Sequence, residues 1–252
     1  MRIQRLAWAG IKVEVGAVTL FVDAVEGGPY FHVPPVPLSA ETSERHALVT
    51  HAHTDHYDPA ALARILGEDG TVICHDATVG DIARPGLHVR GVPLHASVFL
   101  NDLTADLVAT AVPAADGWGL TQVSWVIDGG GRRIIHCGDT LWHGHWWDIT
   151  RRFGPFDLAF LPINGVIYRR GRYIGSDIPA TLTPTQAATA GHLLGARVVV
   201  PFHYGNDRDP EHYREQPDAE ATFLREAGER GVRTHLLAPG AWLDWDVAVG
   251  AA

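Results

Sequence analysis

The sequence predicts a single α/β domain that is rich in β-strands, and three observations support this. Short apolar runs bounded by glycine and turn residues recur along the whole chain. The clearest helical patterns lie in its first and last thirds. The 252 residues are 46% hydrophobic, which is enough for one sizeable core. Because no linker, repeat or low-complexity tract divides the chain, one domain over residues 1–252 is the simplest organisation.

The strands are predicted first. Ile11–Val15 and Val18–Val22 are separated by Gly16, a pattern typical of a β-hairpin. A second hairpin turn is expected at Asp128–Gly131. The other expected strands are Ile3–Leu6, Ala47–Thr50, Thr71–Cys74, Leu107–Val112, Val123–Ile127, Arg133–His136, Leu158–Leu161, Arg197–Pro201, Val232–Leu237 and Trp242–Val247.

Three helices are predicted from their start signals and periodicity. Pro59–Leu66 has Asp58 as its N-cap and a proline in its first turn. Pro184–Leu194 follows Thr183 in the same way, and Ala219–Arg230 is the third helix. Helices at both ends of a strand-rich chain are consistent with an α/β domain.

Composition excludes several classes of protein. The net charge of −9 argues against a broad nucleic-acid surface. Lys12 is the only lysine and the P-loop motif is absent, so P-loop chemistry is excluded. No G-x-S-x-G segment marks a serine hydrolase. No apolar stretch is long enough to span a membrane. Arg5, Lys12 and Glu14 stand where a secretory signal needs its apolar run, so a cytoplasmic protein is expected.

The segment Thr50–Tyr57 carries the strongest chemical signal. It places His51, His53, Asp55 and His56 directly after a predicted buried strand. In extended backbone His51 and His53 point to the same side, and the other two follow around the turn. Four such side chains can line one pocket and serve two neighbouring metal ions. Imidazole and carboxylate suit zinc and also accept iron or manganese. A solvated polar loop is the alternative.

Two later segments also follow predicted strands. In His136–Thr140, Asp139 can give one carboxylate oxygen to each metal ion. In Pro201–Tyr204, His203 can complete the second site. Taken alone, Gly-Asp is an ordinary turn, and a single histidine at a strand end is more often a core residue. Together with the first motif they indicate a metal centre.

These motifs resemble those of the metallo-β-lactamase-fold hydrolases. The similarity is to the branch that includes bacterial ascorbate-6-phosphate lactonase-like proteins and N-acylphosphatidylethanolamine phospholipase D. The resemblance implies an αββα sandwich with two divalent metal ions at one edge of the paired sheets. Zn²⁺ is the first choice for these ions. The resemblance extends over nearly the whole chain, through Val18–Asp23, the H-x-H-x-D-H segment, Gly138–Thr140, Leu161–Asn164, the Thr183–Gly195 helix and Pro201–Gly205.

One position departs from the family pattern. The family usually supplies a third histidine to the first metal in a segment like Pro-Ala-x-His-Gly, where this chain has Asp116. An aspartate can still bind zinc, with a shorter reach and an added negative charge. We expect Asp116 to be the ligand. A neighbouring histidine (His95, His143 or His145), or a weakened first site, is the alternative.

The resemblance also implies roles around the metal ions. A water held between two cations would be the nucleophile. Asp55 is expected to orient this water, and His143 is a candidate for protonating the leaving group. Trp118 and Trp142 are expected in the substrate pocket, with core positions as the alternative. Asp23 is expected either to hydrogen-bond a ligating histidine or to shape a turn.

The sequence thus predicts a metal-dependent hydrolase of an ester, lactone or phosphodiester. Its partner would be a small molecule, with no nucleic acid and no membrane insertion, and the oligomeric state is left open. The alternative is a non-catalytic or redox-type metal-binding protein in which Asp116 alters the first metal site. Arg169–Arg172 could bind a phosphate or carboxylate, with a solvated loop as the alternative.

Overall fold

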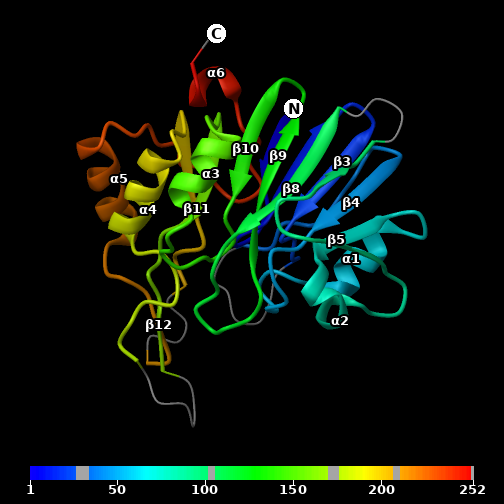
Figure 1. Cartoon of the computed structure of the whole chain (residues 1–252), viewed down its shortest axis with the longest axis horizontal. Helices are drawn as coiled ribbons and strands as arrows, with labels where there is room; N and C mark the ends of the chain where they lie inside the picture. Colours follow the sequence, from blue (N-terminus) through cyan, green and yellow to red (C-terminus); the bar gives the residue numbers. More distant parts are fainter. Residues whose placement is uncertain (27–33, 102–105, 170–175, 207–210, 251–252) are drawn as a thin grey trace.

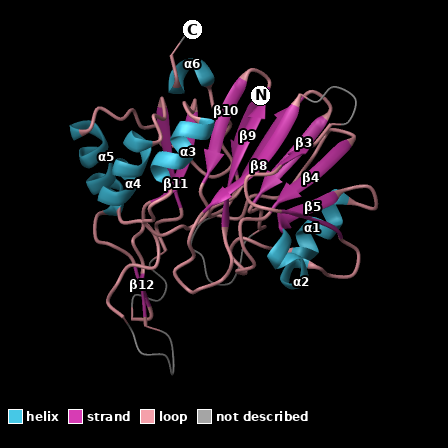
Figure 2. Cartoon of the chain, viewed as in Figure 1, coloured by secondary structure: helices cyan, strands magenta, loops and turns pink. Residues whose placement is uncertain are grey.

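Two β-sheets lie face to face, with helices on both outer faces (Figures 1 and 2). The computed structural model describes residues 1–26, 34–101, 106–169, 176–206 and 211–250. The four layers confirm the predicted αββα sandwich.

The first sheet contains six strands in sequence order. The hairpin around Gly16 forms as predicted, since Val15 pairs with Val18. The last four strands of this sheet, beginning with the second strand of the hairpin, are mutually parallel. Their carboxyl ends therefore meet at one edge of the sheet. The strands are β1 (Arg2–Arg5), β2 (Ile11–Val15), β3 (Val18–Val22), β4 (Glu44–Leu48), β5 (Thr71–His75) and β6 (His88–Val92).

The second sheet has the order β13-β11-β10-β9-β8-β7. The strands β10, β11 and β13 are parallel, and β8 runs the same way because both β8 and β10 are antiparallel to β9. Gly130 and Gly131 have φ of +53° and +71°, which the tight turn between β9 and β10 requires. The strands are β7 (Ser97–Phe99), β8 (Leu107–Pro113), β9 (Val123–Gly129), β10 (Arg132–His136), β11 (Leu158–Pro162) and β13 (Val198–Phe202).

Alternation along the strands builds three cores. Leu20 of β3 points between the sheets, where it shares a core with Trp125 and Phe160. Its neighbour Phe21 points outward, into the core that the first sheet forms with Leu62. Side chains of a strand alternate between its faces, so a strand buried on both sides contributes to two cores. A third core lies between the second sheet and its helices.

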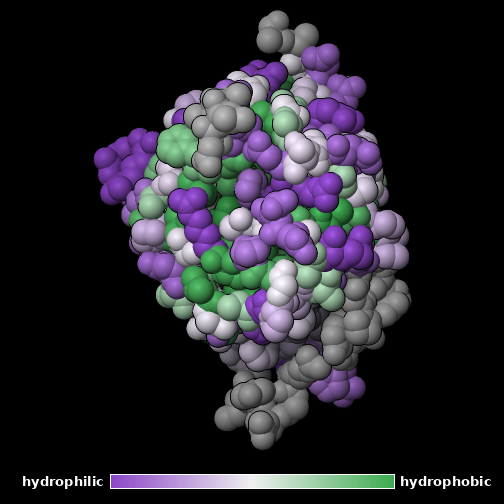
Figure 3. Space-filling model, turned by 90° about the vertical axis from the view of Figure 1, so that its right-hand side faces the viewer, coloured by the Kyte–Doolittle hydropathy of each residue, from purple (hydrophilic) through white to green (hydrophobic). Residues whose placement is uncertain are grey.

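The helices form the outer layers (Figure 1). Figure 3 views the side that carries α1 and α2, where hydrophobic areas lie between hydrophilic ones. Within the described residues, no helix is long and apolar enough to span a bilayer. The helices are α1 (Pro59–Leu66), the 3₁₀ turn Asp76–Thr78, α2 (Val79–Ile82), α3 (Trp146–Phe153), α4 (Pro184–Leu193), α5 (Ala219–Glu229) and α6 (Trp245–Ala248).

The end of the chain differs from the sequence prediction. The expected strand Trp242–Val247 is wrong, because α6 begins at Trp245 and only one bridge pairs Trp242 with Gln4. Asp244 caps α6 by accepting hydrogen bonds from the two backbone amides that follow Trp245. The expected strand Val232–Leu237 is reduced to a single bridge between Thr234 and Val199.

A small sheet outside the sandwich was not predicted. It pairs β12 (Ile167–Tyr168) with β14 (Tyr213–Arg214), each only two residues long. The helix α3 and the strands β6 and β7 were also missed. Strands this short carry no readable periodicity, and their pairing joins segments far apart in sequence.

The cap of α4 gives a first prediction. The hydroxyl of Thr183 accepts a hydrogen bond from the Gln186 amide, and the Gln186 side chain accepts one from the Thr183 amide. We expect Thr183→Ala to lower the free energy of unfolding by about 1 kcal/mol in urea titrations, because a capping bond is lost. Thr183→Ser keeps the hydroxyl and serves as the control. Equal loss in both variants would contradict the role of the cap.

Candidate metal centre

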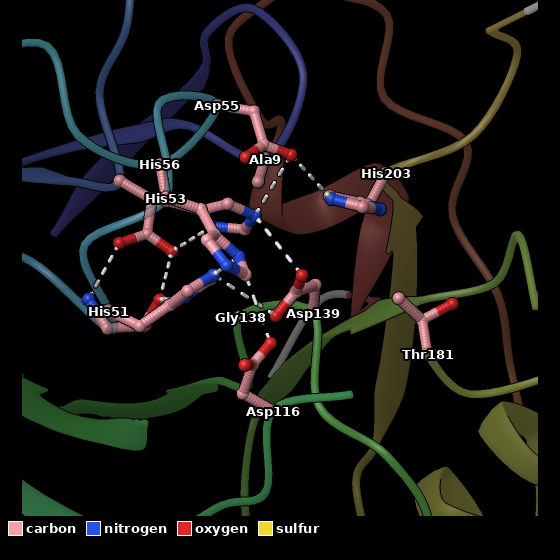
Figure 4. Close-up of polar contacts among 12 residues, drawn as sticks. Ala9, His51, His53, Asp55, His56, Asp116, Gly138, Asp139, Thr181 and His203 are labelled. Carbon is pink, nitrogen blue, oxygen red and sulfur yellow. Dashed lines mark hydrogen bonds and ion pairs between the residues drawn. The ribbon is translucent and has the colours of Figure 1, made fainter. Parts of the chain in front are cut away.

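The predicted ligands come together at one edge of the sandwich. Each follows the carboxyl end of a strand, and the strands concerned in each sheet run in the same direction, so their ends lie at one edge. This is why segments far apart in sequence contribute to one centre (Figure 4). His51, His53, Asp55 and His56 follow β4, Asp116 follows β8, Asp139 follows β10 and His203 follows β13.

A first group contains His51, His53, Asp116 and Asp139. One potential ligand atom from each lies within 4.8 Å of all the others. Nε2 of His51 is 2.8 Å from Nδ1 of His53 and 3.5 Å from Oδ1 of Asp139. Nδ1 of His53 is 3.8 Å from Oδ1 of Asp116. Two imidazoles and two carboxylates therefore converge on one point.

The loop around Asp116 fixes its carboxylate. Oδ2 accepts hydrogen bonds from the amides of Trp118 (3.0 Å) and Leu120 (2.7 Å). Oδ1 is buried and has no hydrogen-bond partner among the described residues. Gly117 lies against Ala180 so closely that a Cβ would come within 2.2 Å of its carbonyl oxygen. The backbone thus holds one oxygen of Asp116 and leaves the other facing His53.

The histidines considered as substitutes for Asp116 do not join this group. The structure gathers Asp116, and neither His95, His143 nor His145, with the other ligand atoms. The amide of His95 bonds Ala111 at the end of β8, and His143 and His145 lie just before α3. Asp116 is therefore the side chain that the structure offers at this position.

A second group contains Asp55, His56 and His203. Oδ2 of Asp55 is 3.3 Å from Nε2 of His203 and 3.6 Å from Nε2 of His56. That His56 nitrogen is buried and has no hydrogen-bond partner in the part of the chain that the structure describes. It is also 3.8 Å from Oδ2 of Asp139, whose other oxygen approaches His51. Asp139 thus approaches a histidine of each group.

Buried hydrogen bonds orient the ligands from behind. Asp23, at the end of β3, accepts 2.8 Å bonds from Nδ1 of His56 and the amide of Thr50. It also accepts a 2.7 Å bond from the Thr50 hydroxyl, which lies 3.0 Å from Nδ1 of His51. The hydrogen bond expected between Asp23 and a ligating histidine is present. It turns Nε2 of His56 toward the site.

Sequence reasoning missed one of these contacts. The indole of Trp8 donates a 3.2 Å hydrogen bond to Oδ2 of Asp55. Trp8 lies between β1 and β2, and nothing in its local sequence marks it as a neighbour of Asp55, because the contact is made only when the strands assemble.

The predicted ligands lie close enough to shift one another's pKa values. Burial lowers the pKa of His56, but Asp55, Asp23 and Asp139 outweigh it and raise the value to about 10. Burial, and then the charge of Asp139, raises the pKa of Asp116. Burial likewise raises the pKa of Asp139. Carboxylates held this close in a buried site favour a bound cation.

A cavity of about 380 Å³ opens onto these ligands. Trp118 lines it, as expected. Trp142 and His143 are not among the described residues that do so. Trp142 instead packs against the rings of Trp146 and Trp147. The described lining consists of Ala52, His53, Thr54, Asp55, Trp118, Asp139, Val166, Tyr168, Ala180, Thr181, His203 and Tyr213.

The structure gives no support to the catalytic role suggested for His143. Its ring stacks on Trp146 with centroids 4.1 Å apart. Burial and the neighbouring His145 lower its pKa to about 4. The ring is therefore neutral at pH 7 and does not hold the extra proton that a leaving group would take.

The arginine-rich segment contributes little to the described site. Arg169 pairs with Asp177 at an exposed position. Residues 170–172 of this segment lie outside the described residues.

Known proteins resemble this chain in both sequence and fold. A family model described as a beta-lactamase superfamily domain matches residues 19–204. The chain belongs to this superfamily. A UPF0173 metal-dependent hydrolase from Rubrobacter xylanophilus is 30% identical over 207 residues, which cover 77% of this chain and 76% of that protein. The chain is therefore a member of a family of metal-dependent hydrolases.

Solved structures share the superfamily's fold. The metallo hydrolase Igni18 from Ignicoccus hospitalis has a TM-score of 0.72 at 20% identity, over 96% of this chain and 97% of its own. CmlA, a diiron β-hydroxylase from Streptomyces venezuelae, has a TM-score of 0.73 at 18% identity, over 96% of this chain and 53% of its own. At these identities the likeness is one of fold alone.

The environment of His143 predicts a pH effect on stability. In the folded protein its pKa is about 4, whereas an unfolded histidine has a pKa of about 6.5. Between these values the unfolded chain binds the extra proton, so stability is lost as the pH falls. We expect His143→Gln to lose less stability than the wild type between about pH 7 and pH 5 in urea titrations.

His88→Gln, at an exposed position of β6, is the matched control and should follow the wild type. If His143→Gln loses as much stability as the wild type over this range, the neutral state of the folded ring is disproved.

Proposed function

We propose that this protein is a hydrolase with a dinuclear metal centre. His51, His53 and Asp116 would hold the first ion, Asp55, His56 and His203 the second, and Asp139 both. The observation that carries the proposal is the meeting of the two ligand groups at Asp139. Two of their atoms, Oδ1 of Asp116 and Nε2 of His56, are buried and lack a hydrogen-bond partner within the described residues.

The donor set suits two divalent cations. Four imidazoles and three carboxylates favour Zn²⁺ as the proposed ion, and manganese and iron fit the same ligands. Three carboxylates leave a net charge of about +1 on a centre with two dications. When bound, the ions would lower the pKa of a water molecule and polarise the oxygen of the substrate bond.

The side chains around the ions have complementary tasks. Oδ2 of Asp55 is engaged by Trp8 and His203, while Oδ1 makes no hydrogen bond within the described residues. We propose that Oδ1 accepts a hydrogen bond from the attacking water and so orients it. Trp118 would pack against the substrate and exclude bulk water from the reacting bond.

The proposed substrate is a small molecule with an ester, lactone or phosphodiester bond, and the proposed location is the cytoplasm. Such bonds are cleaved by an activated water without a nucleophilic side chain. The competing function is a non-catalytic or redox-type metal protein, favoured by the carboxylate of Asp116 where the family usually has an imidazole. The experiment below separates the two.

Metal content tests the assignment of Asp116. We expect the wild type, purified without added metal, to carry about two ions per chain by mass spectrometry. Asp116→Ala should carry about one ion and hydrolyse esters, lactones or phosphodiesters at least about 100-fold more slowly, because a metal ligand is lost. Asp148→Ala, on the exposed face of α3, is the control and should retain both the wild-type metal content and the wild-type rate of hydrolysis.

The results separate the possible outcomes. Two ions in both proteins would show that another residue replaces Asp116. Two ions without turnover of any of the three substrate classes would favour the non-catalytic or redox-type protein.

Metal removal should also destabilise the fold. The buried carboxylates of Asp116 and Asp139 repel each other when no cation separates them. We expect a chelator to lower the melting temperature by about 10 °C, because ligands that bind only the folded state stabilise it by about 4 kcal/mol at a thousandfold excess over Kd. Restored Zn²⁺ should reverse the shift in differential scanning fluorimetry. An unchanged melting temperature would argue against a bound ion.

A further inference from the structure

The small sheet outside the sandwich places two tyrosines beside the metal ligands. Tyr168 of β12 and Tyr213 of β14 are directly opposite each other in the register. Side chains at opposed positions lie on the same face, and both rings line the cavity. Tyr168 contacts Tyr213 edge to face at 5.2 Å and Trp118 at 4.5 Å. One wall of the cavity is therefore aromatic.

A buried side chain fixes the direction of hydrogen bonding at Tyr213. Nδ2 of Asn164 donates to the Tyr213 hydroxyl at 2.8 Å, and its Oδ1 accepts from the Thr181 hydroxyl. The Thr181 hydroxyl accepts from the Val166 amide and donates to Oδ1 of Asn164, so the NH₂ group of Asn164 faces Tyr213.

This direction leaves the Tyr213 hydrogen available. The oxygen of Tyr213 accepts from Asn164, and within the described residues its hydroxyl donates to no protein atom. Burial raises the pKa of Tyr213, so the hydroxyl keeps its hydrogen at neutral pH. The cavity that it lines also contains Asp139 and His203. A residue with a hydrogen-bond donor thus lines the same cavity as proposed metal ligands.

We propose that Tyr213 donates a hydrogen bond to the carbonyl oxygen of the substrate, an uncharged ester or lactone whose apolar part packs against Trp118 and Tyr168. This inference rests on the proposed hydrolase function. The attacking water forms a bond to the carbonyl carbon, and the π electron pair moves onto the carbonyl oxygen. Tyr213 stabilises this oxyanion without giving up its proton. The pair then returns, the bond to the leaving oxygen breaks, and that oxygen takes the proton of the attacking water. A carboxylic acid and an alcohol result.

The charges in the cavity favour a neutral carbonyl compound over a phosphodiester. No arginine or lysine is among the described residues that line it, so the proposed metal ions, which Asp55 and Asp139 largely neutralise, would be its main positive charge. Arg214 in β14 and Arg169 just after β12 form ion pairs with the exposed carboxylate of Asp177. Phosphodiesters carry a charge that proteins usually meet with arginine or lysine. The described lining supplies one tyrosine hydroxyl and apolar surface instead.

Tyr213→Phe tests the proposal because it removes only the hydroxyl. We expect kcat for para-nitrophenyl butyrate to fall about 100-fold, as when one donor to a developing oxyanion is lost. The KM and metal content should stay near wild type. Tyr204→Phe is the matched control, since that hydroxyl donates to Glu220 away from the cavity. It should keep the wild-type kcat.

Two further measurements distinguish this inference from the proposed function. The affinity for trifluoroacetophenone, whose hydrate has a tetrahedral carbon that bears two oxygens, should fall about tenfold in Tyr213→Phe, a loss of about 1.4 kcal/mol. Wild-type turnover of bis(para-nitrophenyl) phosphate should be slower than that of the butyrate.

The inference is overturned if Tyr213→Phe keeps kcat within about threefold of the wild type, or if the phosphodiester is the faster substrate. If the wild type cleaves neither compound, the proposed hydrolysis of these bonds fails. In that case the affinity for trifluoroacetophenone alone tests Tyr213. An affinity that is the same in Tyr213→Phe and the wild type overturns its role as a donor.

Discussion

The arrangement of the candidate metal centre depends on the hydrogen bonds that the buried carboxylate of Asp23 accepts. This carboxylate joins the end of β3 to Thr50 and His56, and Thr50 in turn meets His51. A carboxylate can be this deeply buried only if its oxygens are satisfied, and here each accepts at least one hydrogen bond. The same bonds aim ring nitrogens from both ligand groups into the site. One residue therefore links the fold of the first sheet to both proposed ions.

The second sheet brings the remaining ligands to this anchor. Parallel direction in β8, β10, β11 and β13 puts Asp116, Asp139, Asn164 and His203 at one edge, although the chain between them is long. The core between the sheets fixes how closely the two edges approach. The rigidity of the centre is thus a consequence of packing in the sandwich, with short loops carrying the chemistry.

The cavity has two contrasting sides. Asp55 and Asp139 line one side with carboxylates that favour divalent cations, and Asp116 adds a third carboxylate beside Asp139. Trp118, Tyr168 and Tyr213 form an aromatic side that favours apolar groups. A substrate held between them would present its reacting bond to the ions and its apolar part to the rings.

The sequence by itself determined the fold class, most strands, three helices and the spacing of the candidate ligands. These features are local: Asp58 and Thr183 cap helices that follow them directly, and the H-x-H-x-D-H segment lies within six residues. Only the tertiary structure decided that Asp116, and not a nearby histidine, joins the first group, that His143 lies away from the cavity, and that Trp8 and Tyr213 reach the site. Each of these depends on contacts between segments far apart in the chain, which no local pattern specifies until the strands are paired and the core is packed.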